Sequence, residues 1–357
     1  MLSAIQKELH LRREEINETV ETIYFGGGTP SVLSSDDLSD LIKAVYENYK
    51  VSNEVEITLE ANPDDLLSDT RDESNINIFE AYKNIGINRL SIGVQSFFDT
   101  DLKLMNRAHD GVEAIRCLYE ATQHFENISI DLIYGIQDAP NDRWIQNIET
   151  ALSFNIPHIS SYALTVEPNT ALASYIEKGI ISDTDDEQAQ EQFLILKKKL
   201  EKRDYIHYEL SNFGKESFFS KNNSAYWQGK PYLGIGPSAH SYNGKERAWN
   251  VRNNTKYIKT LEQNNLPIER ETLTKTDHYN EYIMTGLRTM WGVSLEKIEA
   301  EFGNIFKSYL IQQAKPYIKD RLLFLEDNHL KTSKKGLFLS DGIASDLFML
   351  NLEKVKN

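Results

Sequence analysis

The segment Thr22–Pro30 (TIYFGGGTP) decides the fold. A short run of β-branched and aromatic residues favours a strand, and the three glycines and proline that follow favour a turn. Four further runs of the same kind follow along the chain. They are Val55–Leu59 (VEITL), Arg89–Val94 (RLSIGV), Ile128–Tyr134 (ISIDLIY) and His158–Leu164 (HISSYAL).

The spacing of these runs predicts the fold class. They start at residues 22, 55, 89, 128 and 158, so the intervals are 33, 34, 39 and 30 residues. Each interval has room for one strand and one helix, which indicates an α/β fold with a parallel sheet or barrel. We expect helices after a capping Ser35, over Val112–His124 and over Asp183–Asp204. Since residues 1–15 are also expected to be helical, we expect a first strand and its loop to precede them in the complete fold.

The chain changes character after about residue 274. The elements expected there are helices over Glu281–Met290 and Ser294–Phe302, strands over Leu322–Glu326, His329–Thr332 and Gly336–Leu339, and a last helix near Asp346. Helices followed by a hairpin indicate a small winged-helix-like α+β domain. We therefore expect two domains, residues 1–268 and residues 269–357. Such a fold often binds DNA, but this hairpin is only mildly basic, so we expect a structural role.

Composition excludes several classes of function. The 357 residues carry a net charge of −15, which argues against broad binding to nucleic acids or anionic membranes. Residues 1–15 mix charged and apolar side chains and do not resemble a signal peptide, and no apolar stretch is long enough to span a membrane. Cys117 is the single cysteine, so no intrachain disulfide can form. We expect a cytoplasmic protein.

Polar residues follow the predicted strands at the ends where parallel α/β folds place their sites. Gly26-Gly27-Gly28-Thr29-Pro30 follows the first run, and its exposed backbone groups suit a phosphate or an amino-acid head group. A tight strand–helix turn explains the same loop equally well. Glu60 ends the second run and either binds an amine or ribose hydroxyls or caps the next helix. Gln95 ends the third run and serves either a polar ligand or a loop hydrogen bond.

Two further residues belong to this predicted cluster. Arg107, two residues before His109, has the planar fork that binds a carboxylate. Asp131 is an acid within an apolar strand, where it needs a ligand, an ion pair or backbone hydrogen bonds. Together these acids, amides and glycines suit a zwitterionic ligand that carries a ribose.

The sequence resembles a known family in several consecutive motifs. These are YFGGGTPS, EANPDD, RLSIGVQSF, MNRAHD, IDLIYGIQ, SSYALTVEPNT, YELSNF, NNSAYW and YLGIGPSAHSY. In this order they resemble the oxygen-independent coproporphyrinogen oxidase family of radical S-adenosylmethionine proteins, nearest its HemW-like haem chaperone branch. The similarity extends from about Val20 to the C-terminus. It implies a partial (β/α)₆ barrel, here without its first strand and cluster loop, and a family-typical C-terminal domain.

The resemblance also implies site residues. Gly27, Gly28, Thr29 and Pro30 would cradle the methionine part of S-adenosylmethionine. Glu60, Gln95, Arg107 and Asp131 would contact the rest of that cofactor. The family carries a CxxxCxxC loop after its first strand, where three thiolates hold a [4Fe–4S] cluster. This sequence contains no such motif, and we expect a missing upstream segment rather than a genuine loss of the cluster.

The haem-binding motif of the branch, HNxxYW, also differs here. The matching residues are 222–227 (NNSAYW), so Asn222 replaces the histidine, and a carboxamide is a poor iron ligand. Tyr226 and Trp227 are expected either to stack on a porphyrin or to be core aromatics. His240 is the nearest remaining imidazole in sequence, and its alternative role is a hydrogen-bonded core histidine.

Three functions remain open from sequence alone. The first is a haem chaperone that binds haem or porphyrin and delivers haem to client proteins, with membrane contact only through those clients and no nucleic-acid partner. The second is radical-dependent decarboxylation of coproporphyrinogen. The third is a barrel enzyme that uses the glycine loop for phosphate, but GGGTP lacks the lysine common in phosphate loops. The HemW-like motifs favour the first.

Overall fold

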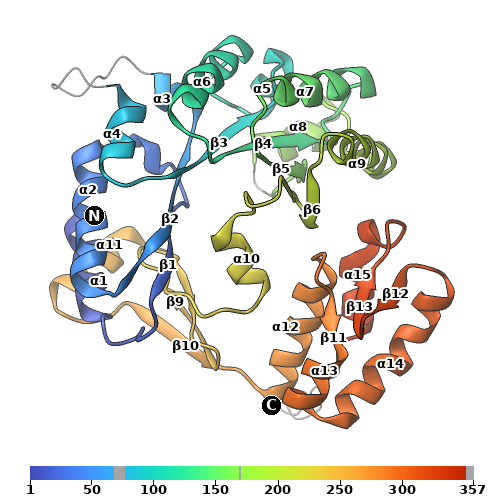
Figure 1. The fold of residues 1–357 in the computed structure, drawn as a ribbon. Helices are drawn as coiled ribbons and strands as arrows, with labels where there is room; N and C mark the ends of the chain where they lie inside the picture. The colour runs from blue at the N-terminus through green and yellow to red at the C-terminus, as the bar shows by residue number, and fades with distance from the viewer. Residues whose placement is uncertain (68–76, 169, 351–357) are drawn as a thin grey trace.

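The computed structural model describes residues 1–67, 77–168 and 170–350, and its main unit is a curled seven-stranded sheet with helices along its outer face (Figure 1). The spatial order of the strands is β1-β2-β3-β4-β5-β7-β6. Their bounds are β1 Val20–Phe25, β2 Val51–Ala61, β3 Arg89–Gln95, β4 Ile128–Tyr134, β5 His158–Ala163, β6 Ile206–Glu209 and β7 Asn212–Gly214. The predicted α/β class and partial barrel are therefore confirmed.

The first five strands are parallel and lie side by side in chain order. Their carboxyl ends consequently meet at one edge of the sheet. Strand β7 pairs antiparallel with β5, and β6 pairs antiparallel with β7. All five strands expected from the sequence are present, and β2 starts earlier than predicted.

The helices that connect these strands cover the outer face (Figure 1). Their bounds are α1 Leu2–Leu11, α2 Ser35–Asn48, α3 Pro63–Leu67, α4 Ile78–Asn84, α5 Asp99–Leu104, α6 Gly111–His124, α7 Asn141–Ser153, α8 Ala171–Glu177 and α9 Asp186–Glu201. A short 3-10 helix, η1, spans Pro30–Val32. The capping residue of α2 is Ser34, whose hydroxyl accepts a hydrogen bond from the Asp37 N–H, so the prediction of Ser35 was wrong by one residue. Both positions are serine, and the backbone turns one residue earlier than expected.

The alternation of side chains along each strand separates an apolar outer face from a polar inner face. Ile57 and Leu59 of β2 are buried in the main core against the helices. The inner face carries polar side chains instead, and several of them are hydrogen-bonded to one another. His158, for example, lies between the Ser129 hydroxyl, 2.6 Å from its Nδ1, and the Tyr208 hydroxyl, 2.7 Å from its Nε2. The curl of the sheet thus encloses a polar concave surface.

A second, three-stranded sheet lies beside α1. It has the order β10-β9-β8, and helix α11 packs against α1. The bounds are β8 His240–Tyr242, β9 Glu246–Asn250, α11 Asn254–Glu262 and β10 Ile268–Thr272. The buried Arg12 guanidinium donates to Glu8 Oε1 of α1 (2.9 Å) and to the Ser241 hydroxyl of β8 (3.0 Å), which fixes the end of α1 on this sheet. Helix α10, Lys221–Trp227, lies between the large sheet and the C-terminal unit (Figure 1).

The C-terminal unit has its own hydrophobic core. Its elements are α12 Lys275–Leu287, β11 Val293–Ser294, α13 Leu295–Lys297, a π-helical turn η2 Ile298–Phe302, α14 Asn304–Lys319, β12 Leu323–Glu326, β13 His329–Thr332, η3 Leu337–Leu339 and α15 Ser340–Asp346. Three strands in the order β11-β13-β12 complete the expected winged-helix-like α+β unit. The predicted strand over Gly336–Leu339 was wrong. Leu339 N–H bonds to the Gly336 carbonyl (2.9 Å), which closes a 3-10 turn, and β11 takes the third place in the sheet.

The domain boundary predicted after residue 268 falls at the start of β10, which still pairs with β9. None of the helices in the described ranges is long and apolar enough to cross a bilayer.

Candidate functional site

The glycine loop after β1 is shaped by close contacts. A Cβ on Gly26 would lie 2.5 Å from the Tyr24 ring and 2.9 Å from the Glu60 carboxyl group, so this position has no room for a side chain. Gly27 and Gly28 have φ angles of +76° and +89°, which side chains rarely adopt, and open space surrounds both. Their backbone groups are therefore accessible to a ligand. The chain then turns at Thr29 into η1, which begins at Pro30.

Glu60 connects this loop to β2. Its Oε1 accepts a hydrogen bond from the Tyr24 hydroxyl (2.7 Å), and its Oε2 accepts one from the Gly27 N–H (3.1 Å). Burial first, and then the charge of Glu60, raise the pKa of Tyr24, so this phenol stays protonated and donates. Glu60 thus holds the glycine loop against β2, a contact that the sequence did not predict.

Gln95 ends β3 in an unusual backbone conformation. Its φ is +65°, although it is not glycine, and its side chain is buried. A Cβ on Gly93 would lie 2.9 Å from Gln95 Nε2, so the carboxamide folds back over the strand end. A strained residue at the end of a strand is typical of functional positions.

Asp131 lies on the inner face of β4, opposite Ser160 of β5. Burial raises its pKa to about 7, and the nearby negative charge of Glu60 adds to this effect. A hydrogen bond with Ser160 and the positive charges of Arg89 and Arg107 act in the opposite direction. An acid in this state can carry or release a proton near neutral pH.

Arg107 follows α5 in an exposed turn. Its backbone N–H bonds to the Leu102 carbonyl (2.9 Å), while the part of the chain that the structure describes offers its guanidinium no ion pair. The neighbouring His109 is buried, and its Nε2 lies 3.1 Å from the Val94 carbonyl. His109 therefore fastens this turn to the end of β3, and Arg107 remains available for a ligand.

The structure thus gathers the predicted residues at one end of the sheet. Gly27 bonds to Glu60, and the charges of Glu60 and Arg107 both act on Asp131. Gln95 stands in register with Leu132, the residue after Asp131. Carboxylates, an amide, a guanidinium without an ion pair among the described residues and a closely approachable glycine backbone form a set of donors and acceptors that fits S-adenosylmethionine.

The residues of this chain do not fit a [4Fe–4S] cluster, because such a cluster needs three thiolates. Cys117 is the single cysteine, and it is buried in α6 within the main core. Burial raises the pKa of its thiol to about 12, so it is a packed thiol and not a metal ligand. Within the described ranges no three His, Cys, Asp or Glu side chains converge as a metal site.

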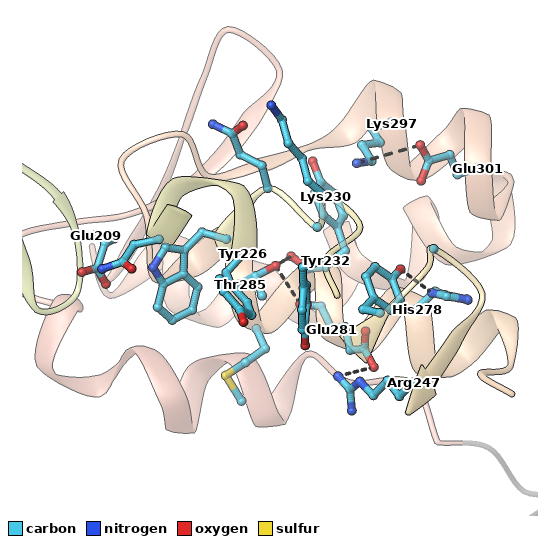
Figure 2. A pocket seen from close by; sticks show the side chains of 18 of the residues that line it. Glu209, Tyr226, Lys230, Tyr232, Arg247, His278, Glu281, Thr285, Lys297 and Glu301 are labelled. Atoms are coloured by element: carbon cyan, nitrogen blue, oxygen red, sulfur yellow. Dashed lines mark hydrogen bonds and ion pairs between the residues drawn. The ribbon is translucent and has the colours of Figure 1, made fainter. Parts of the chain in front are cut away.

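A second feature is a cavity of about 990 Å³ between α10, β6–β7 and α12 (Figure 2). Its size is at the upper end for small-molecule sites. Aromatic side chains line much of it: Tyr162, Tyr226, Trp227, Tyr232, Tyr242, Tyr282 and Phe302. Figure 2 shows Glu209 at one side of the cavity and His278 at the other, with Tyr226 and Tyr232 between them in this view.

The structure places the predicted haem-binding residues in different parts of the molecule. Tyr226 and Trp227 line the cavity, and the Tyr226 ring lies 4.2 Å from that of Tyr232. His240 is exposed on β8, near Trp249, and does not line the cavity. Asn222 does not line it either, because its Oδ1 accepts a hydrogen bond from Thr22 of β1 (3.1 Å).

Two cavity residues were not identified from the sequence. All eight histidines lie in the part of the chain that the structure describes, and among them His278 alone lines the cavity. Glu209, within the quoted motif YELSNF, is 2% exposed, and burial raises its pKa to about 7. No sequence signal marks His278, because it lies on an ordinary amphipathic helix of the C-terminal unit.

These features match known families. Residues 4–151 match the model of the radical SAM superfamily, and residues 273–339 match the HemN C-terminal domain. The class is therefore a radical-SAM-type barrel with a HemN-type C-terminal domain.

Relatives narrow this class. The proteins named heme chaperone HemW from Lactococcus lactis and Bacillus subtilis are each 31% identical, over 91% of this chain and 84% of their own. This chain belongs to the HemW family of radical S-adenosylmethionine proteins. Among solved structures, coproporphyrinogen III oxidase (HemN) from Escherichia coli has a TM-score of 0.81 at 22% identity, over 98% of this chain and 82% of its own, and it confirms the fold.

Proposed function

We propose that this protein is a haem chaperone that binds S-adenosylmethionine at the strand-end cluster, binds haem in the cavity beside α10, and passes haem to client proteins. The observation that carries the proposal is the aromatic cavity of about 990 Å³, in a chain 31% identical to proteins named heme chaperone HemW. A flat aromatic ligand with acidic side groups suits such walls, because stacked rings bury large apolar areas.

Support for S-adenosylmethionine comes from the chemistry of the cluster. The open space around Gly27 and Gly28 lets an amino-acid head group approach the backbone closely, and Arg107 suits its carboxylate. Glu60, Gln95 and Asp131 suit the amine and the ribose hydroxyls. When bound together with a reduced cluster, this cofactor supplies radical chemistry in the superfamily, and no step of that chemistry follows from the residues of this chain.

Coproporphyrinogen oxidation, the alternative from sequence, has less support. The similarity to the Escherichia coli oxidase is one of fold, at 22% identity. Its radical step needs a cluster, for which Cys117 is the single cysteine here. We therefore keep the chaperone as the proposed function.

Haem titration tests the central claim. Stepwise addition of haemin to the full chain should produce a shifted Soret band that saturates at one equivalent. The variant Trp227→Ala, which removes one wall of the cavity, should bind more weakly, whereas Trp249→Ala on β9 is the matched control outside it. An absorbance spectrum that stays identical to that of haemin alone, at micromolar concentrations, contradicts the proposal.

The cofactor site has an independent test by calorimetry with S-adenosylmethionine. Arg107→Ala should lower its affinity on the order of tenfold or more, the loss expected for a charge-assisted hydrogen bond. Arg116→Ala, an exposed arginine on α6, is the control. Equal affinities for both variants would exclude Arg107 from the site.

Delivery is tested by mixing the haem-loaded protein with apomyoglobin as acceptor. The absorbance spectrum should change to that of haem-bound myoglobin. Haem that stays on the chaperone, under conditions where the acceptor takes up free haem, would contradict the delivery step.

A further inference from the structure

We propose that His278 of α12 supplies the axial ligand to haem iron in the cavity, in place of the motif histidine that Asn222 replaces. This inference rests on the proposed haem binding and names the residue that coordinates the metal. A neutral imidazole is the best iron ligand among the side chains that line the cavity, since the others are mainly phenols, carboxylates, amides and amines.

The surroundings of His278 orient its ring. Its Nδ1 lies 3.4 Å from the Tyr242 hydroxyl, and its Nε2 has no hydrogen-bond partner among the described residues. In the tautomer whose proton is on Nδ1, the imidazole donates to the tyrosine oxygen and keeps the lone pair of Nε2 for a metal. Its ring is half-buried at the start of α12, and a capping box of Thr274 and Asp277 fixes that helix end.

The cavity offers complementary contacts to the rest of a porphyrin. The rings of Tyr226, Tyr232 and Tyr242 form a continuous series with centroids 4.2 Å and 6.3 Å apart, and the Tyr242 ring lies 6.3 Å from that of His278. Neighbouring rings in this series are tilted by 43–54°, so a planar ring system can stack on one tyrosine and meet the edges of the others while its metal reaches the imidazole.

The charged side chains of the cavity favour one orientation of bound haem. Lys275 and Lys297 line the cavity from the C-terminal unit, close in sequence to His278 and Glu301. Glu209 lies at the opposite side (Figure 2). Lys297 is paired with Glu301 (3.9 Å), and Arg247 is paired with Glu281 (2.5 Å), whereas Lys275 has no ion pair among the described residues. The negatively charged propionates of haem are thus favoured toward Lys275 and disfavoured beside Glu209.

The other iron ligands considered from the sequence lie outside the cavity. Asn222 is engaged by Thr22 of β1 and does not line the cavity. His240 is exposed on β8, and its ring lies 6.3 Å from that of Trp249. Met284, a thioether that also lines the cavity from α12, is the remaining soft ligand.

The test compares haemin with metal-free protoporphyrin IX on four proteins: the parent chain, His278→Ala, His240→Ala and Met284→Leu. Each is titrated by absorbance and by quenching of tryptophan fluorescence, and the axial ligation of the ferric complex is read by electron paramagnetic resonance. Circular dichroism verifies that each variant is folded.

We expect His278→Ala to lower haemin affinity on the order of tenfold or more and to change the ligation signal. Its affinity for protoporphyrin IX should stay within about twofold of the parent, because that ligand has no metal to coordinate. His240→Ala and Met284→Leu should resemble the parent in both titrations.

An unchanged ligation signal in His278→Ala overturns the inference while leaving haem binding intact. A flat haemin titration of the parent chain overturns the proposed function itself. Loss of both ligands in a folded His278→Ala would show that the residue shapes the cavity rather than binding iron.

Discussion

Replacing Glu209 by glutamine should change how the stability of the protein depends on pH. Glu209 is 2% exposed at the end of β6, and its Oε2 accepts a hydrogen bond from the Ser211 N–H (3.3 Å). Its Oε1 and the Oδ1 of Asn212 are both buried without a partner among the described residues. Burial raises the pKa of Glu209 from 4.5 to about 7, although hydrogen bonds with Ser211 and Asn212 act in the opposite direction.

The sign of the effect follows from proton binding. Between pH 4.5 and pH 7 the folded protein holds a proton on Glu209 that the unfolded chain has released. The free energy of unfolding therefore falls as pH rises through this range. With these two pKa values, the contribution of this group decreases by about 2 kcal/mol between pH 5.5 and pH 8. Glu209→Gln keeps the shape and an acceptor for the Ser211 N–H but has no proton to lose, so it should not show this decrease.

Urea unfolding at pH 5.5 and pH 8, followed by tryptophan fluorescence, measures the difference. The parent should lose about 2 kcal/mol more than Glu209→Gln over this interval. Glu216→Gln, an exposed glutamate just after β7, is the control and should follow the parent. Identical pH dependence for the parent and Glu209→Gln would refute the assignment of a buried, protonated Glu209.

Three further outcomes are expected. Arg12→Ala should lower the free energy of unfolding by about 3–5 kcal/mol, because it leaves Glu8 buried without its charge partner. Arg13 is exposed, so Arg13→Ala should change the free energy of unfolding little. Urea unfolding measures both variants. Affinity for S-adenosylmethionine should rise from pH 6 to pH 8 as Asp131 ionises, and calorimetry should find a flatter profile for Asp131→Asn. Gly28→Ala, at a φ of +89°, should cost roughly 1 kcal/mol of stability in thermal unfolding and should weaken cofactor binding in the same calorimetry.

The strand framework was predictable because it leaves a periodic signal in the chain. Each of the five expected runs became a parallel strand, and Ala114, Cys117 and Leu118 form the buried face of α6 as expected. The errors occurred where local hydrogen bonds determine the bounds or the type of an element. Ser34 rather than Ser35 caps α2, and the turn after Gly336 closes as a 3-10 helix because β11 already pairs with β13.

The two candidate sites also differed in how far the sequence predicted them. Parallel strands deliver their carboxyl ends to one edge, so Gly27, Glu60, Gln95 and Asp131 were expected to meet, and the structure places them together. The cavity forms where α10 meets the C-terminal unit, and its lining depends on how two separately folded cores pack. His278 was not identified for this reason, since no pattern along the sequence connects it to Tyr226.

The charges of Asp131 and Glu209 both act on one residue, Tyr162. Tyr162 lines the cavity, and the charges of Asp131 and Glu209 both raise the pKa of its hydroxyl, although burial contributes most. The phenol therefore stays protonated between two acids whose own pKa values lie near 7. A cationic ligand at the strand ends favours the ionised form of Asp131, so its binding must release a proton near neutral pH. A negative ligand in the cavity favours the protonated form of Glu209 instead. The two acids are therefore expected to exchange protons in opposite senses when their sites are filled, with release at Asp131 and uptake at Glu209.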